Sequence, residues 1–150
     1  MERMNRNDYF MNIARTTAKR STCGRATVGA IIVKNNRIVA TGFNGAPEGM
    51  DHCDDHGCLL FNNHCIRTVH AEINCIVQAA RMGISIDNSV IYVTHKPCHN
   101  CCKAMINAGI KIVYYDIDYS DGFNHLYDSK ISIFKHKMED DCNEKNNFRD

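Results

Sequence analysis

Residues 90–108 read VIYVTHKPCHNCCKAMINA, a β-rich run followed by a proline and then a helix-forming run. The first part, Val90–Thr94, favours a short strand because β-branched and aromatic residues dominate it. The second part predicts a helix over about Cys98–Ala108, with the proline just before its start and a glycine directly after its end. Ile110–Tyr115 then has the apolar character of another buried strand. This strand–helix–strand order predicts an α/β fold.

The alternation of strands and helices continues on both sides of this segment. Helices are expected over Asp8–Arg20 and about Thr68–Met82, and strands over Ala26–Val33 and Arg37–Phe43. The two asparagines between these strands suit a tight hairpin, because Asn tolerates positive φ. The remaining expected elements are a short helix within Asp121–Tyr127 and a last strand over Ile131–Phe134. An antiparallel first pair followed by alternating elements predicts helices packed on a mixed sheet.

The composition suits one domain spanning residues 1–150, in which the charged, Asn-rich stretch 138–150 is expected to be a flexible tail. The formal net charge is +1 and no basic stripe with interleaved aromatic residues is present, so no nucleic-acid partner is expected. The chain has no apolar run that could cross a bilayer, and its start lacks the apolar segment of a secretory signal. We therefore expect a cytoplasmic protein without a membrane partner.

Two short motifs carry the chemistry. The motif HAE begins at His70 and contains Glu72, and the motif PCHNC contains Cys98 and Cys101. Imidazole and thiolate ligands suit zinc, and two cysteines three residues apart on a helix face the same side. Three protein ligands leave a fourth zinc position open, as in catalytic sites. Glu72 is a poor co-ligand two residues from His70, and it is better placed to move protons.

Other interpretations exist for each half of this pattern. A Cys-x-x-Cys pair alone is compatible with a redox site or a structural zinc knuckle, and Cys102 could supply a fourth ligand. The nine cysteines are odd in number and are interspersed with histidines, which favours reduced thiols over a disulfide framework. The order H-x-E and then P-C-x-x-C is the pattern of zinc-dependent nucleobase deaminases. The conjunction therefore favours a deaminase over a closed zinc site.

From about Thr22 to Asp116 the chain resembles the deoxycytidylate deaminases of the cytidine deaminase superfamily. Beyond the two motifs, the resemblance includes TVGAIIV at 27–33, TGFNGAPEG at 41–49, HCIRT at 64–68, THKPC at 94–98 and INAGIK at 106–111. These runs distinguish the chain from nucleoside cytidine deaminases, whose zinc ligands are all cysteines, and from tRNA adenosine deaminases, which lack the intervening loop. Two departures are Phe43, where the family usually has Tyr, and Cys75, where it usually has Ala; we expect Cys75 to be a core residue.

The resemblance implies a cytidine-deaminase-like three-layer sandwich with a five-stranded mixed sheet. It implies one catalytic zinc and the conversion of dCMP to dUMP with release of ammonia, in a homo-oligomer that is often a hexamer, activated by dCTP and inhibited by dTTP. Glu72 would take a proton from water, deliver it to N3 and then protonate the departing amine. By resemblance, Asn44 is a candidate for holding the sugar or base. Arg25 is a candidate for the 5′-phosphate, or alternatively an ordinary exposed residue.

The resemblance also implies a second metal site, next to the loop of residues 44–63, which is rich in Gly, Asp, His and Cys. Cys23, Cys53 and His64 match positions that hold a structural zinc in some family members. The possible alternates are Cys58, Cys65, His52 and His56. Such a zinc would contribute to folding, whereas the alternative is that these are buried thiols.

Two competing functions remain open at this stage. One is a deaminase that acts on another cytosine nucleotide, such as dCTP or CMP. The other is a non-catalytic zinc-binding module, which would have no open metal position and no need of Glu72.

Overall fold

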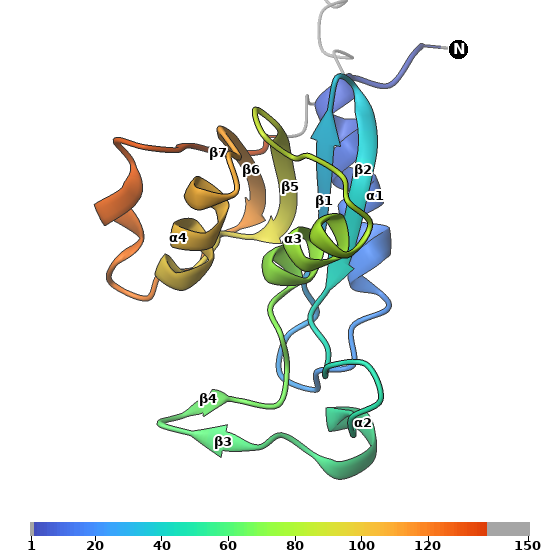
Figure 1. Cartoon of the computed structure of the whole chain (residues 1–150), viewed down its shortest axis with the longest axis vertical. Helices are drawn as coiled ribbons and strands as arrows, with labels where there is room; N and C mark the ends of the chain where they lie inside the picture. Colours follow the sequence, from blue (N-terminus) through green and yellow to red (C-terminus); the bar gives the residue numbers. More distant parts are fainter. Residues whose placement is uncertain (1, 138–150) are drawn as a thin grey trace, which may run out of the picture.

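The computed structural model describes residues 2–137 of the chain, so the expected tail at 138–150 lies outside the described residues. Five strands form one sheet in the order β2-β1-β5-β6-β7 (Figure 1). They are β1 Gly29–Lys34, β2 Arg37–Phe43, β5 Val90–His95, β6 Ile112–Ile117 and β7 Ser132–Lys135. β1 runs antiparallel to both β2 and β5, whereas β5 is parallel to β6 and β6 to β7. The predicted five-stranded mixed sheet is confirmed.

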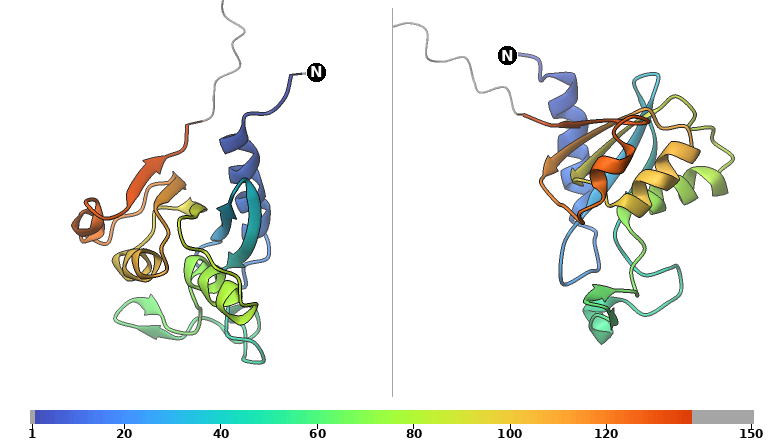
Figure 2. Two further views of the ribbon diagram at one scale, coloured as in Figure 1. Left: turned by 45° about the horizontal axis from the view of Figure 1, so that its top comes forward. Right: turned by 90° about the vertical axis from the view of Figure 1, so that its left-hand side faces the viewer.

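Helices cover both faces of the sheet and complete three layers (Figure 2). α1 Arg6–Ala18 lies on one face, and α3 Ala71–Arg81 and α4 His99–Asn107 lie on the other. None of the helices within residues 2–137 is long and apolar enough to cross a membrane.

The core has two parts, one on each side of the sheet. Successive strand side chains point to opposite faces, so β1 is buried on both. Ile31 and Val33 pack with Phe10 in the core under α1. Ala30 and Ile32 belong to the larger core beneath α3 and α4. β1 therefore joins the two cores through the middle of the sheet.

Two glycines allow helices to approach the sheet closely. A Cβ atom on Gly29 would lie 2.2 Å from the carbonyl oxygen of Ala14 in α1. A Cβ atom on Gly42 would lie 2.4 Å from the carbonyl oxygen of Ala71 and 2.7 Å from the amide nitrogen of Cys75. All three separations are far below a normal van der Waals contact, so the first turn of α3 can rest on β2 only because residue 42 has no side chain.

The start of α3 differs from the prediction. The helix was expected from about Thr68 but begins at Ala71. Val69 is extended instead, and it exchanges two backbone hydrogen bonds with Gly45, of 2.8 and 3.2 Å. This bridge holds the residues before α3 against the end of β2.

The segment predicted as a long loop contains small elements of its own. They are α2 Cys53–His56, β3 Leu60–Phe61 and β4 His64–Cys65. β3 and β4 form a short hairpin whose turn residues, Asn62 and Asn63, have φ values of 47° and 62°. These elements form a lobe that extends away from the main sheet, at the bottom of Figure 1. Further along the chain, the short helix expected within 121–127 is a 3-10 turn, η1 Asn124–Tyr127.

Candidate metal centre and active-site pocket

Four chain segments meet at one edge of the sheet. β5 ends at His95, and because β1 runs antiparallel to it, the start of β1 at Gly29 lies at the same edge. Phe43, the last residue of β2, pairs with Gly29 and lies there too. The bridge between Val69 and Gly45 brings the start of α3 to the same edge. The start of α4 lies there because only three residues separate it from the end of β5. The topology thus brings together residues far apart in the sequence.

The predicted metal ligands converge at this edge. His70 directly precedes α3, Cys98 directly precedes α4 and Cys101 lies in the first turn of α4. The Nδ1 atom of His70 is 3.5 Å from the Sγ of Cys98 and 3.4 Å from the Sγ of Cys101. A tetrahedral zinc with ordinary Zn–N and Zn–S bond lengths separates such atoms by about 3.6 Å. The three side chains therefore fit a zinc ion with little rearrangement.

The electrostatics of these ligands also suit a metal cation. Hydrogen bonds from Cys101 and His70 outweigh burial and lower the pKa of the Cys98 thiol to about 4. The hydrogen bond between His70 and Cys98 in turn raises the pKa of the His70 imidazole to about 8. The pKa of Cys101 is raised, because its thiol hydrogen-bonds to Cys98 and is buried. One thiolate is thus already favoured, and metal binding would release the proton of the second thiol.

Glu72 lies beside these ligands in the first turn of α3. Its side chain is buried, with 4% of the residue exposed, and it lines the same pocket as His70 and Cys98. Burial raises its carboxyl pKa above the ordinary value. A buried carboxyl group in a cleft with a raised pKa is a typical acid–base candidate.

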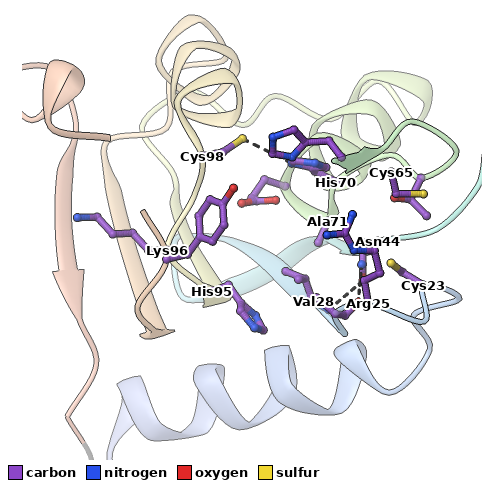
Figure 3. Close-up of a pocket in the computed structure, with 15 residues that line it drawn as sticks. Cys23, Arg25, Val28, Asn44, Cys65, His70, Ala71, His95, Lys96 and Cys98 are labelled. Carbon is purple, nitrogen blue, oxygen red and sulfur yellow. Dashed lines mark hydrogen bonds between the residues drawn. The ribbon is translucent and has the colours of Figure 1, made fainter. Parts of the chain in front are cut away.

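A pocket of about 280 Å³ opens beside this centre (Figure 3). In Figure 3, His70 and Cys98 face each other at one side of it. Its lining residues with polar or ionisable side chains are Cys23, Arg25, Asn44, His64, Cys65, Thr68, His70, Glu72, His95, Lys96, Cys98 and Tyr119. The volume is near the lower end of small-molecule sites, which span roughly 300–1,000 Å³. The pocket is therefore suited to a compact polar ligand rather than a large one.

Both residues predicted to bind substrate line this pocket, and both also make contacts within the chain. The side-chain oxygen of Asn44 accepts a hydrogen bond of 2.8 Å from the amide of Val28, and its nitrogen donates one of 2.7 Å to the carbonyl of Ala26. This tie keeps residues 26–28 out of the sheet, which explains why the strand predicted from Ala26 begins at Gly29. Arg25 is exposed and donates one hydrogen bond of 2.8 Å to the carbonyl of Asn63. Each side chain keeps further donors for a ligand.

A second cysteine group lies in the lobe. The Sγ atoms of Cys53, Cys58 and Cys65 all lie within 4.8 Å of one another, and those of Cys53 and Cys65 are 3.6 Å apart. Burial raises the pKa of the Cys53 thiol. Burial acts to raise the pKa of the Cys65 thiol, but hydrogen bonds from the backbone of Arg67 and from Cys53 outweigh it and lower the pKa to about 7. Three thiols this close form a second candidate metal site.

The ligand set of this second group differs from the one that the resemblance implied. Cys53 and two of the alternates, Cys58 and Cys65, are in it, whereas Cys23 and His64 lie outside it. Cys23, His64 and Cys65 all line the pocket, so Cys65 belongs both to this group and to the pocket wall. The two histidine alternates also lie outside the group: the ring of His52 is 3.2 Å from the Thr22 hydroxyl and that of His56 is 3.6 Å from Asp51.

The family of the chain follows from comparison with known proteins. Residues 4–117 match the family model described as the cytidine and deoxycytidylate deaminase zinc-binding region. The chain belongs to this deaminase family.

Members of the deaminase family with close similarity include proteins from bacteria, yeast and phage. The chain is 52% identical over 119 residues to ComE operon protein 2 of Bacillus subtilis, and this match covers 79% of the chain and 63% of that protein. It is 36% identical over 121 residues to the deoxycytidylate deaminase of Schizosaccharomyces pombe, and this match covers 75% of the chain and 37% of that enzyme. The matched region is thus less than two thirds of the length of either relative.

A solved structure gives the same result for the fold. The dCMP deaminase of the cyanophage S-TIM5, in complex with dCMP and dUMP, superposes with a TM-score of 0.79 at 34% identity. The match covers 91% of this chain and 100% of that one. The cytidine-deaminase-like fold predicted for the chain is therefore confirmed.

Several pocket residues were not predicted from the sequence as ligand contacts. His95 is the last residue of β5 and Lys96 follows it, and both line the pocket; strand ends commonly carry binding residues in α/β sheets. Tyr119 lies beyond β6 in a stretch without a recognisable motif. The position at the end of a strand was a usable signal for the first two residues, whereas the sequence contained none for the third.

Proposed function

We propose that this chain catalyses the hydrolytic deamination of dCMP to dUMP, with release of ammonia. The observation that carries the proposal is the buried Glu72 carboxyl beside the convergent His70, Cys98 and Cys101, all at one pocket. A member of the same family that superposes over 91% of this chain was solved in complex with dCMP and dUMP. A non-catalytic zinc module has no use for such a carboxyl group or for an open pocket.

His70, Cys98 and Cys101 would hold the zinc. Their mutual distances and the low pKa of Cys98 support this assignment. When bound, zinc acts as a Lewis acid that lowers the pKa of a coordinated water molecule to about 7. Because α3 and α4 both begin at the centre, the three ligands are held by backbone that the sheet supports.

Glu72 would handle the protons of the reaction. Hydrolysis replaces the C4 amino group by oxygen, so one proton must move from water to N3 and another must reach the departing amine. A single carboxyl group can do both in turn when it is shielded from bulk water and within reach of the ring. The burial of Glu72 in the pocket wall supports this role.

The guanidinium group of Arg25 would bind the 5′-phosphate. Arg25 retains most of its guanidinium donors, and guanidinium geometry matches phosphate oxygens. Lys96 also lines the pocket, but its ammonium group lies over the ring of Tyr115, 5.8 Å from the ring centre, and points away from Arg25 (Figure 3). The charge of Arg25 favours a nucleotide over a free nucleoside. It distinguishes neither the number of phosphates nor the 2′ position of the sugar, so dCTP and CMP remain the alternative substrates.

We further propose that Cys53, Cys58 and Cys65 hold a structural zinc. The three thiols connect α2 to the hairpin that carries His64 into the pocket wall. A metal there would stabilise the lobe and so fix that part of the wall. The alternative is that the thiols pack without metal.

Activation by dCTP, inhibition by dTTP and a homo-oligomer such as a hexamer are proposed on the family resemblance alone. One experiment tests the substrate and the regulation together. The purified chain is given dCMP, dCTP, CMP and deoxycytidine in turn, with and without dCTP or dTTP as effector, and ammonia release is followed. Preference for dCMP supports the proposal, and release from dCTP or CMP alone supports the alternative substrate. No release from any cytosine compound by the zinc-loaded chain favours the non-catalytic module.

A further inference from the structure

Residues 118–124, which follow β6, contact the backbone around Cys98. They lie outside residues 4–117, the part of the chain that matches the family model. We propose that Asp121 and Asn124 are positioning residues that fix the backbone on both sides of Cys98 and so set the geometry of the metal centre. This role rests on the proposed function, because it concerns the same centre.

The contacts of these two residues bracket Cys98. One carboxylate oxygen of Asp121 accepts a hydrogen bond of 2.7 Å from the backbone amide of His99 and one of 2.6 Å from the Nδ1 of the same residue. The side-chain amide of Asn124 donates to the carbonyl oxygen of Pro97. The residue before Cys98 and the residue after it are therefore both held from the same short segment.

This segment is itself well ordered by internal contacts. Asn124 is 3% exposed, and its side-chain oxygen accepts a hydrogen bond of 3.1 Å from the amide of Asp121. The second carboxylate oxygen of Asp121 accepts one of 2.9 Å from the amide of Phe123, whose ring meets that of His99 edge-on at 5.4 Å between centres. Asp121 and Asn124 thus act as one unit, which we call the Asp121–Asn124 clamp.

The start of α4 needs a partner of this kind. The first amides of a helix have no acceptor within the helix, and the Cys98 side chain at the cap position makes no capping hydrogen bond. Asp121 supplies the acceptor for His99 from another part of the chain, and its negative charge suits the helix N-terminus. Burial acts to raise the pKa of Asp121, but the hydrogen bonds from His99 and Phe123 outweigh it and bring the pKa to about 2. The carboxylate is therefore ionised at neutral pH.

The geometry requirement is strict because the metal is held from two separate helices. The Sγ of Cys98 must stay 3.5 Å from the His70 ring, which belongs to the start of α3. A loop that is free to shift would have to be ordered each time a metal binds. Removing groups that hydrogen-bond directly to metal ligands generally weakens metal affinity by about 10- to 100-fold; Asp121 and Asn124 hold the residues on either side of a ligand, and we expect a loss on the same scale.

The test measures zinc affinity of the full chain by competition with a chelator of known affinity, in Asp121→Ala, Asn124→Ala and the milder Asp121→Asn. Asp128→Ala is the matched control, because it removes an exposed carboxylate from the same stretch. The chain is proposed to bind two zinc ions, so the titration must tell the two sites apart. The zinc site that is lost in His70→Ala is the catalytic centre. Cobalt in place of zinc reports the thiolate coordination through its absorption spectrum.

We expect zinc affinity at that site to fall about 10- to 100-fold in both alanine variants and less in Asp121→Asn, with Asp128→Ala unchanged. The double alanine variant should be little weaker than either single one, because the two residues act as a unit. Ammonia release should recover when excess zinc is supplied. The far-ultraviolet circular dichroism and melting temperature of the metal-free variants show whether each one folds.

Affinity within about twofold of wild type in folded Asp121→Ala and Asn124→Ala would overturn the clamp, whatever the activity of these variants. If the alanine variants lower only the melting temperature and leave the affinity of the folded chain unchanged, the residues are merely structural and the clamp fails as well. If instead the wild-type chain binds zinc through His70 but deaminates no cytosine nucleotide, the proposed function fails while the clamp stands.

Discussion

At the scale of single residues, Glu72 is the side chain on which the proposed chemistry depends. The substitution Glu72→Gln preserves shape but cannot carry a proton between water and the substrate. Turnover of dCMP should fall by about 10²- to 10⁴-fold or more, since general acid–base groups contribute on this scale. Zinc content should stay at the wild-type level, because Glu72 is outside the ligand group. Rates of ammonia release and metal analysis of the same sample measure both.

The control for this substitution is Glu48→Gln, an exposed carboxylate that pairs with Arg81. It should leave turnover unchanged. Near-normal deamination by Glu72→Gln would remove Glu72 from its assigned role.

Arg25 can be tested through the part of the substrate that it is expected to contact. Losing a hydrogen bond to a charged group costs about 1.5–3 kcal/mol, so Arg25→Ala should lower kcat/KM for dCMP by about 10- to 150-fold. Weak activity on deoxycytidine, which has no phosphate, should not change. Steady-state kinetics on both compounds, with Arg37→Ala as a control at the exposed β1–β2 turn, give the comparison. An equal loss on deoxycytidine would show that Arg25 acts through the fold of the pocket instead.

At the scale of elements, the contact between α3 and β2 positions half of the metal centre. Gly42→Ala would place a Cβ atom 2.4 Å from the carbonyl oxygen of Ala71, at the first turn of α3. The helix start, with His70 and Glu72, must then move. Overpacking of this kind costs about 1–3 kcal/mol of folding free energy, and we expect the displaced His70 to weaken zinc binding as well. Denaturant unfolding and zinc affinity measure the two effects.

The matched control is Gly24→Ala, since no atom lies within 4 Å of the added methyl group. It should change neither quantity. Equal stabilities and equal affinities for the two variants are incompatible with close packing of α3 on β2.

The elements also show how far the sequence could be interpreted. The long periodic helices, the β1–β2 hairpin and the strands of the main sheet followed from their patterns, and Cys75 is fully buried as expected. The two-residue strands β3 and β4 were missed because so short a run has no measurable period. The packing that brings Cys58 and Cys65 next to Cys53 was equally hidden, so these two residues were only alternates.

For the site, the two motifs contained enough chemistry to select His70, Cys98, Cys101 and Glu72. Their convergence depends on strand order, which local patterns do not encode. Asp121 had no motif at all, because its contact with His99 joins residues 22 positions apart through an irregular segment. Positions of this kind are determined by the tertiary fold rather than by local sequence.

At the scale of the whole molecule, the lobe of α2, β3 and β4 is expected to depend on a second metal. Purified chain should contain two zinc ions, and Cys58→Ser should contain one. The melting temperature should fall in Cys58→Ser, because metal binding contributes to folding free energy. Elemental analysis and thermal unfolding measure both quantities, and Cys102→Ser, at a buried thiol outside either metal group, is the control for zinc content. A single zinc in the wild-type chain would contradict the second site.

The central claim is that a zinc ion held by His70, Cys98 and Cys101 makes this pocket a deaminase for a cytosine nucleotide. The most direct measurement is ammonia release from dCMP as zinc is returned to the chain after a chelator has removed it. We predict no turnover without metal. As zinc is returned, the rate should rise in proportion to the occupancy of the zinc site that requires His70. The claim would be contradicted if the folded chain, with zinc in that site, released no ammonia from dCMP. It would also be contradicted if the chain deaminated dCMP equally well without metal.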